Sequence, residues 1–210
     1  MKKQLAVLVL ISFWGGCAGY SQKMSDIFVR MPDSLVQTLD KDLRTTLIDF
    51  WADENKNAIV RNNLGGQSEL KELSDDYLFL QTSTGNSIEI KMLPINEYYN
   101  ILCLVNTGCA PACDSDISFY TVDWKSLKNS YFPPITESAF FKSNPTDSCS
   151  DKIESLDMHP IKLALNKDNL KLTATYSIGQ YLNKEEFEKL KSCLLESISF
   201  DWIDGKYQSE

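Results

Sequence analysis

Apolar side chains recur at every second position from about residue 57 onward, and no other feature of the sequence limits the fold as strongly. Residues 88–92 alternate between apolar and charged types, which places Glu89 and Lys91 on the exposed face of a predicted strand. Other strands are predicted at 58–60, 77–80, 99–106 and 117–124. The turn residues 84–86 join two of these runs, and consecutive strands joined by short turns pair antiparallel.

A helical pattern precedes the strands. Residues 33–52 carry apolar side chains at a spacing of four: Leu35, Leu39, Leu43, Leu47 and Trp51. Ser34 and Gln37 resemble a capping box, and residues 40–42 can divide the segment into two short helices, with Asp42 capping the second. The apolar stripe needs a partner surface, which the strands that follow provide.

The last third of the chain predicts the same kinds of element. They are strands at 161–165 and 170–176, a hairpin turn at 167–169, a helix opened by Asn183 and Glu186, and a strand at 198–202. The predicted fold class is therefore α+β. We expect an N-terminal helical segment packed on a mainly antiparallel sheet, with a second hairpin, a helix and a final strand at the C-terminus.

Residues 1–21 have the pattern of a secretory signal peptide. Two lysines precede the apolar run 5–13, which is too short for a bilayer span of about 20 residues. We expect cleavage before Gln22. One α+β domain then occupies residues 22–210, with a candidate internal subdivision in the irregular region near 129–151.

A lipoprotein is the alternative interpretation of the same segment. Gly15 and Gly16 precede Cys17, which is then the lipidated residue, although Trp14 stands where a lipobox usually has an aliphatic side chain. Either form is exported, so we expect the protein in the periplasm, at the outer membrane or outside the cell. Contact with a membrane is expected only if Cys17 is lipidated.

Export allows disulfides to form and persist. Beyond Cys17 the chain has Cys103, Cys109, Cys113, Cys149 and Cys193, an odd number that leaves at least one without a partner in the chain. Cys109 and Cys113 form the nearest pair, and Pro111 favours a turn between them. We therefore predict a disulfide there. The sequence leaves the pairing of Cys103, Cys149 and Cys193 open, and Cys103 has the surroundings of a buried small hydrophobe.

Composition removes several classes of function. The 210 residues carry 29 acidic and 21 basic side chains, a net charge of -8, which argues against nucleic acid as a partner. The chain has one histidine, His159, and no Gly-x-Ser-x-Gly elbow, zinc-binding motif or complete EF-hand loop. We assign no catalytic, cofactor-binding or metal-binding residue. His159 is interpreted as structural or surface, and Asp114 and Asp116 as residues of a solvated turn.

Three further groups of residues invite a functional interpretation. Adjacent carboxylates occur at 53–54, 75–76 and 185–186, but their spacing selects no acid–base pair. Gly65-Gly66 predicts a turn rather than a phosphate loop. The chain also has an aromatic group that can stack on sugars or anchor a protein: Tyr98, Tyr99, Phe119, Tyr120, Trp124, Tyr131 and Phe132. Because most of these lie on predicted strands, a role in the core is favoured.

Several short motifs together resemble one known family. They are Met24-Ser25-Asp26-Ile27-Phe28, Met31-Pro32-Asp33-Ser34-Leu35, Arg44, Asp49-Phe50, Asn63-Leu64-Gly65-Gly66, Asp76-Tyr77-Leu78, Leu93-Pro94, Phe119-Tyr120 and Trp124. The chain resembles a secreted Bacteroidales family catalogued as a domain of unknown function (number 3256), well over residues 22–130 and loosely elsewhere. The resemblance implies export and a single conserved unit, and it implies no activity or ligand. The loop 109–113 departs from the usual pattern of the family.

These observations predict an exported protein that is a non-enzymatic binding or structural component of the cell envelope. The expected partner is another envelope or extracellular protein or a glycan, with no cofactor. The alternative is a hydrolase acting on carbohydrate or peptidoglycan through paired carboxylates. A third interpretation is an inhibitor or ligand-binding module that presents the loop 107–116.

Overall fold

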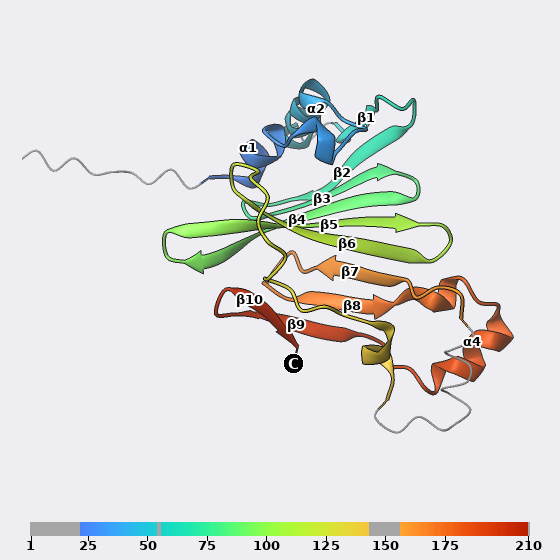
Figure 1. Cartoon of the computed structure of the whole chain (residues 1–210). Coiled ribbons are helices and arrows are strands. Elements are labelled where there is room, and N and C mark those ends of the chain that lie inside the picture. Colours follow the sequence, from blue (N-terminus) through green and yellow to red (C-terminus); the bar gives the residue numbers. More distant parts are fainter. Residues whose placement is uncertain (1–21, 54–55, 143–155, 210) are drawn as a thin grey trace, which may run out of the picture.

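A computed structural model describes residues 22–53, 56–142 and 156–209. The described chain forms three layers: helices, a six-stranded sheet and a four-stranded sheet (Figure 1). The helical layer holds α1 (Met24–Val29), the 3-10 turn η1 (Asp33–Leu35) and α2 (Lys41–Ala52). The first sheet holds β1 (Ile59–Arg61), β2 (Gln67–Leu73), β3 (Tyr77–Ser83), β4 (Asn86–Asn96), β5 (Tyr99–Cys109) and β6 (Cys113–Thr121). The chain continues with η2 (Glu137–Phe140), β7 (Ile161–Leu165), β8 (Leu172–Tyr176), η3 (Ser177–Gln180), α4 (Lys184–Lys191), β9 (Ile198–Ile203) and β10 (Lys206–Ser209).

The first sheet is an antiparallel meander in the order β1-β2-β3-β4-β5-β6. The predicted turn at residues 84–86 joins β3 to β4, because Gln81 pairs with Ser87 and Ser83 with Asn86. The predicted α+β class is confirmed. The prediction missed β2 because its residues alternate polar side chains with few apolar ones, so that only its register with β3 reveals the strand.

The two faces of the first sheet bury different cores. Even-numbered residues face the helices: Leu78, Leu80, Ile88, Ile90, Leu102 and Leu104. Odd-numbered residues face the second sheet: Tyr77, Leu93, Ile101, Cys103, Val105 and Phe119. Because successive side chains of a strand point to opposite faces, covering both faces buries almost every position of the central strands.

Glu89 and Lys91 correct the sequence prediction. Their alternation with apolar neighbours predicts an exposed face, but Glu89 is 9% and Lys91 2% exposed. The reason is that β7 crosses this face of the sheet and contacts β4, β5 and β6. A polar face of a strand is therefore buried here by a segment more than 70 residues later in the chain.

The helical layer also differs from the prediction at its caps. Helix α2 begins after Asp40, whose carboxylate accepts a hydrogen bond of 3.0 Å from the Leu43 N–H. Asp40 is therefore the N-cap and Asp42 lies inside the first turn. The hydrogen bond to the Leu43 N–H lowers the pKa of the Asp40 carboxyl. Trp51, at the end of the predicted stripe, is partly exposed.

The second sheet has the order β10-β9-β8-β7. Its first hairpin turns at the predicted residues 167–169, since Leu165 pairs with Leu172. Asn183 and Glu186 form the predicted capping box at the start of α4. The predicted last strand is followed by one more, β10, which pairs with β9 across the turn at Asp204 and Gly205.

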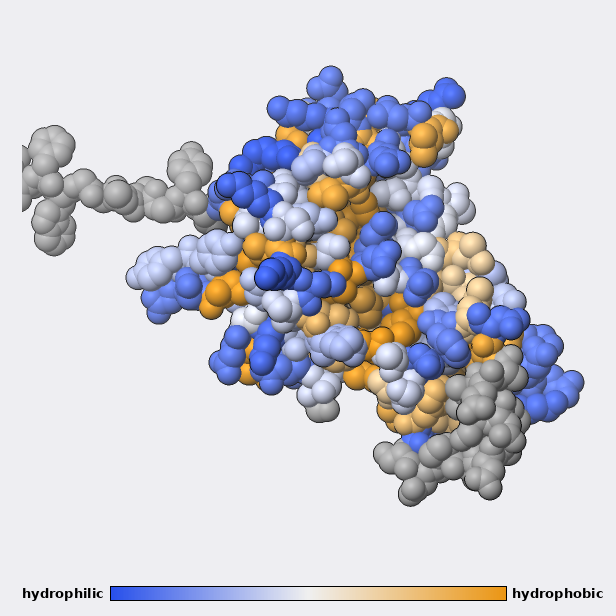
Figure 2. Space-filling view, viewed as in Figure 1, coloured by the Kyte–Doolittle hydropathy of each residue, from blue (hydrophilic) through white to orange (hydrophobic). Residues whose placement is uncertain are grey.

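The segment after β6 ties the three layers together. It runs down one side of the molecule from the helices to the second sheet (Figure 1). The Trp124 indole N–H donates to the Ile27 carbonyl at 2.9 Å, and the Tyr207 N–H donates to the Tyr131 carbonyl at 2.8 Å. In Figure 2, apolar residues gather along the middle of this side, whereas hydrophilic residues cover α2. The region near 129–151 is thus irregular as predicted up to residue 142, and 143–151 lie outside the described residues.

Candidate functional site

The two sheets meet along a row of hydrogen bonds from the backbone of β7 to side chains of the first sheet. Asp114 Oδ1 accepts from Ile161 N at 2.9 Å, Ser115 Oγ from Leu163 N at 3.0 Å and Glu89 Oε2 from Leu165 N at 2.9 Å. We term these six residues the polar seam. Alternate N–H groups of a strand point to the same edge, and in β7 these are the N–H groups of Ile161, Leu163 and Leu165. The side chains of the polar seam accept hydrogen bonds from all three. This edge of β7 is therefore not open to pairing with a further strand.

Glu89 is the buried carboxylate of the polar seam. Its Oε2 also accepts a hydrogen bond of 3.1 Å from the Tyr77 hydroxyl. Burial raises the pKa of Glu89 above its ordinary value, while the hydrogen bonds from Leu165 and Tyr77 and the charge of Lys162 oppose that rise. Burial and the Glu89 charge raise the pKa of Tyr77 as well. The carboxyl is occupied by the backbone and a tyrosine, so its role is to join the sheets.

Lys91 is a buried cation beside the polar seam. Its Nζ lies 2.9 Å from Asp76 Oδ2 and donates to the Lys167 carbonyl at 2.9 Å. It also lies 5.7 Å from the centroid of the Tyr77 ring. The carboxylate of Asp76, the carbonyl of Lys167 and the ring of Tyr77 thus replace the water that the ammonium loses on burial. A buried cation needs such partners, because its desolvation is costly.

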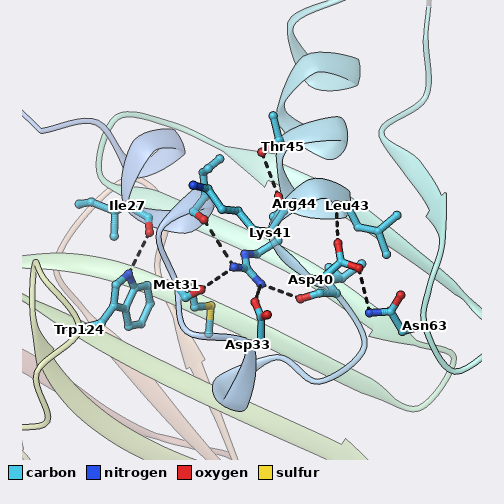
Figure 3. Close-up of polar contacts among 12 residues, drawn as sticks. Ile27, Met31, Asp33, Asp40, Lys41, Leu43, Arg44, Thr45, Asn63 and Trp124 are labelled. Carbon is cyan, nitrogen blue, oxygen red and sulfur yellow. Dashed lines mark hydrogen bonds and ion pairs between the residues drawn. The ribbon is translucent and has the colours of Figure 1, made fainter.

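Arg44 is the second buried cation, with 2% of the residue exposed. Figure 3 shows its guanidinium pointing into the loop between α1 and α2. Its Nη1 lies 2.8 Å from Asp33 Oδ1 and 2.6 Å from the Leu39 carbonyl, and its Nη2 donates to the Met31 carbonyl at 2.5 Å. The planar fork of arginine matches several acceptors at once, so Arg44 fixes the path of this loop.

Cys109 and Cys113 form a disulfide at the end of the β5–β6 hairpin. Both residues belong to strands and pair with each other across the turn. The bond closes a short loop and lies at the rim of the sheet. Cys17, the alternative lipidation site, lies outside the described residues.

Two of the remaining cysteines, Cys103 and Cys193, lie among the described residues, and both are buried. Cys103 is a fully buried free thiol, as its apolar neighbours predict, and burial raises its pKa. Cys193 is buried and disulfide-bonded. Cys149 lies outside the described residues.

His159 lies at the surface against one tyrosine. Its Nδ1 is 2.8 Å from the Tyr176 hydroxyl, and the two rings stack with centroids 6.2 Å apart. Burial raises the pKa of Tyr176 to about 12. A hydrolytic triad needs the histidine between a nucleophile and a carboxylate, and this contact with tyrosine provides neither.

The adjacent carboxylates of the sequence serve local structure. Asp76 binds Lys91, Glu185 binds Lys189 at 2.6 Å, Asp53 binds Lys56 at 3.2 Å and Glu186 caps α4. Glu54 lies outside the described residues. Gly65 has a φ of 84°, so the predicted glycine turn is confirmed.

Asp114 and Asp116 correct another prediction, because both lie in strand β6 rather than in a turn. They line an open groove of about 430 Å³ between β6, β7 and the segment after β6. The opposite wall is formed by Phe132, Pro133, Pro134 and Ile135. Neither the groove nor its apolar wall is evident from the sequence, because β6, the wall and β7 are brought together only by the fold.

The predicted aromatic group divides between core and surface. Phe119 is buried as expected, and Trp124 is buried with its indole bound to the helical layer. Tyr98 and Tyr99 correct the prediction, since they are 94% and 40% exposed. Tyr98 lies in the turn of the β4–β5 hairpin, and Tyr99 is the first residue of β5, paired with Asn96 beside that turn. The adjacent Asn96 and Glu97 could have indicated the turn.

The β4–β5 hairpin projects beyond the rest of the sheet at this turn. Strand β4 pairs with β3 only as far as Lys91, but with β5 as far as Asn96. The projecting part reaches past the neighbouring strands and lies beside the β9–β10 turn (Figure 1). The hairpin therefore presents Tyr98 at its exposed turn, with the partly exposed Tyr99 beside it.

The β9–β10 hairpin braces the projecting part. The Trp202 indole N–H donates to the Pro94 carbonyl at 2.7 Å. The Gly205 turn also lies against Ile95, since a Cβ at Gly205 would be 3.5 Å from Ile95 Cδ1. The next residue along β9, Ile203, is 46% exposed. We define the aromatic end as Tyr98, Tyr99, Trp202 and Ile203; the last two were not singled out from the sequence.

In the described part of the chain, no three His, Cys, Asp or Glu side chains come together as metal ligands would. No helix within residues 22–53, 56–142 or 156–209 is long and apolar enough to cross a membrane.

Comparison with known proteins places the fold. The family model described as "Protein of unknown function (DUF3256)" matches residues 18–207. Among solved structures, the chain is similar to a domain of an uncharacterized protein from Porphyromonas gingivalis W83, with 24% identity and a TM-score of 0.77. That similarity covers 88% of this chain and 98% of the other, and at this identity it shows a shared fold. No curated protein matches the chain.

Proposed function

The chain belongs to the DUF3256 family, whose function is not established, and we propose that it is an exported, non-enzymatic binding component of the cell envelope. The signal-like residues 1–21 support export. The observation that carries the binding role is the 94% exposure of Tyr98 at the turn of the projecting hairpin. The aromatic end is the proposed contact surface.

The aromatic end has the physical properties of a contact surface. Tyrosine and tryptophan are enriched among the residues that contribute most to binding, because they bury a large area at a small cost in side-chain entropy. The hydrogen bond from Trp202 to Pro94 and the contact between Gly205 and Ile95 hold the hairpin in place. A braced surface loses little further conformational freedom when it binds.

The shape of the aromatic end favours a protein partner over a glycan. Small-ligand sites are concave and flank their aromatic rings with fixed polar groups. Tyr98 projects at a hairpin turn, and the nearby Ile203 adds exposed aliphatic surface. A convex surface of aromatic and aliphatic side chains can insert into a pocket of a second protein.

The hydrolase alternative needs two carboxyls on opposite walls of a groove, about 5 to 9.5 Å apart. The groove at β6 offers Asp114 and Asp116, two residues apart on one strand and therefore on one wall. The apolar residues Phe132 to Ile135 form the other wall. This groove therefore does not supply the opposed pair of carboxyls that the hydrolase alternative needs.

The test is the size of the complex in which the protein migrates, measured in gentle extracts of the cells that make it naturally. Tyr98→Ser/Tyr99→Ser should shift the protein from the complex to its free position. Tyr181→Ser is the control, because Tyr181 is a surface tyrosine, 47% exposed, that lies beyond η3. A complex that survives the double substitution, or a wild-type protein that migrates alone, would contradict the proposal.

A further inference from the structure

Strand β6 is the edge strand of the first sheet. Its odd-numbered residues direct their backbone groups to the outer edge, away from β5. The Thr121 N–H donates to Lys125, and the Phe119 carbonyl accepts from Leu127. Both groups point away from β5. Since backbone groups of a strand alternate between its two edges, every odd-numbered residue of β6 directs its N–H and C=O to this outer edge.

The chain itself occupies both ends of that edge. At the far end, the Gln180 side chain accepts from the Cys113 N–H at 3.2 Å, and the Ser177 hydroxyl donates to the Cys113 carbonyl. The Asn129 amide donates to the Ile117 carbonyl at 3.4 Å. Gln180 and Ser177 thus cap the edge at Cys113, and Asn129 caps it at the Ile117 carbonyl. The N–H and C=O of Ser115 and the N–H of Ile117 lie between these capped positions. In the described chain no strand pairs with β6 on this edge.

The groove of about 430 Å³ lies at this uncapped stretch, with Ser115 and Ile117 in its lining. One wall carries Asp114 and Asp116, both exposed. The other wall is the apolar run Phe132 to Ile135. The groove therefore combines an open backbone edge, two negative charges and an apolar surface.

We propose that this groove accepts an extended segment of a basic polypeptide as an added strand beside β6. The backbone of the segment pairs with Ser115 and Ile117, which is the recognition mode known as strand addition. Its lysine or arginine side chains lie near Asp114 and Asp116, and its apolar side chains lie on Phe132 and its neighbours. Charge complementarity selects this occupant over an acidic or neutral segment.

This proposal goes beyond the proposed function and concerns another surface. Tyr99 begins strand β5 at the aromatic end, whereas the groove lies near the other end of the same strand, at Cys109. Each surface can be tested without disturbing the other. A negative result for the groove therefore does not bear on the aromatic end, and the converse also holds.

The test uses the peptide acetyl-KVKVKVK-amide and the full mature chain, followed by amide resonances in nuclear magnetic resonance spectra. The resonances of Ser115 and Ile117 should move on titration. The same peptide with every amide N-methylated keeps its charges but cannot pair as a strand, so it should leave these two resonances in place. The acidic peptide acetyl-EVEVEVE-amide should also fail to bind.

One substitution tests the charged wall. Asp116→Asn should weaken binding of the basic peptide about threefold, the size of one solvent-exposed ion pair. Asp116 is chosen because Asp114 also holds Ile161. Glu188→Gln removes one exposed charge from α4 and is the matched control. Absence of movement at Ser115 and Ile117, or equal movement with the N-methylated peptide, would overturn the proposal.

Discussion

The carboxylate of Glu89 accepts a hydrogen bond of 2.9 Å from the backbone N–H of Leu165, and this bond joins strand β4 to strand β7. The two residues are 76 positions apart. An acidic side chain here takes the place of a backbone acceptor on a neighbouring strand. Asp114 and Ser115 also accept hydrogen bonds from backbone N–H groups of β7 through their side chains. Side chains of the first sheet thus satisfy one edge of a strand of the second sheet.

Glu89→Gln should change how stability depends on pH. Because burial raises the pKa of Glu89, the folded protein binds this proton more tightly than the unfolded protein does. The free energy of unfolding therefore loses this contribution as the pH rises from about 4.5 through the raised pKa. The glutamine variant keeps an acceptor oxygen without a charge. Urea unfolding at a series of pH values should show that the free energy of unfolding of the variant increases relative to that of the wild type as the pH rises.

Glu89→Ala is the control for the same site. It removes the acceptor and leaves the N–H of Leu165 buried without a partner, which costs about 1 to 3 kcal/mol. It should destabilise the protein at every pH, unlike the glutamine variant. A difference between Glu89→Gln and wild type that stays constant with pH would contradict the assignment of a raised pKa to this carboxyl.

Lys91 and Asp76 should respond unequally to substitution. Asp76→Ala leaves the Lys91 ammonium buried without its counter-charge, and we expect a loss of about 2 kcal/mol or more. Lys91→Met fills the same space without a charge, and the half-exposed Asp76 can then be hydrated. Denaturant unfolding of both variants should find the methionine variant the more stable. The reverse order would contradict the burial of Lys91.

Arg44→Lys should loosen the loop between the two N-terminal helices. A lysine keeps the charge but cannot serve Asp33, Leu39 and Met31 together, so at least one charged hydrogen bond worth about 1.5 to 3 kcal/mol is lost. Hydrogen exchange should speed up within residues 24–39 and much less in the first sheet. The matched control is Arg30→Lys, since Arg30 is a surface residue whose ion pair with Asp123 spans 3.5 Å.

The disulfide should contribute little to the stability of the fold. Cys109 and Cys113 are four positions apart, and chain-entropy arithmetic for so short a loop gives about 2 kcal/mol. Cys109→Ser/Cys113→Ser should therefore remain folded, with faster hydrogen exchange confined to the end of the β5–β6 hairpin. Loss of cooperative unfolding in this variant would contradict that estimate.

Local patterns in the sequence predict the elements that local forces form. The capping box of Asn183 and Glu186 and the hairpin turns at 84–86 and 167–169 depend on residues a few positions apart, and all three are confirmed. Strand β2 was missed because few of its residues are apolar, and α1 because six residues are too few to establish a helical period.

The candidate sites depend on contacts that no local pattern contains. Glu89 and Lys91 look exposed until β7 is placed over them, and Asp114 looks like a turn residue until β6 is extended to Cys113. Tyr98 is the converse case, because it sits among strand residues and yet lies in a turn. The distant strand β7 decides the burial of Glu89 and Lys91, whereas the local hairpin turn decides the exposure of Tyr98.

The proposed binding role of the aromatic end is tested most directly by photo-crosslinking in the cells that make the protein naturally. A photoreactive phenylalanine at position 98 places the reactive group where the exposed Tyr98 ring lies, and the same group at position 181 is the control. We predict one discrete protein adduct from position 98, absent from position 181 and reduced by Ile203→Ser. No adduct at position 98, or the same adducts from both positions, would contradict the account.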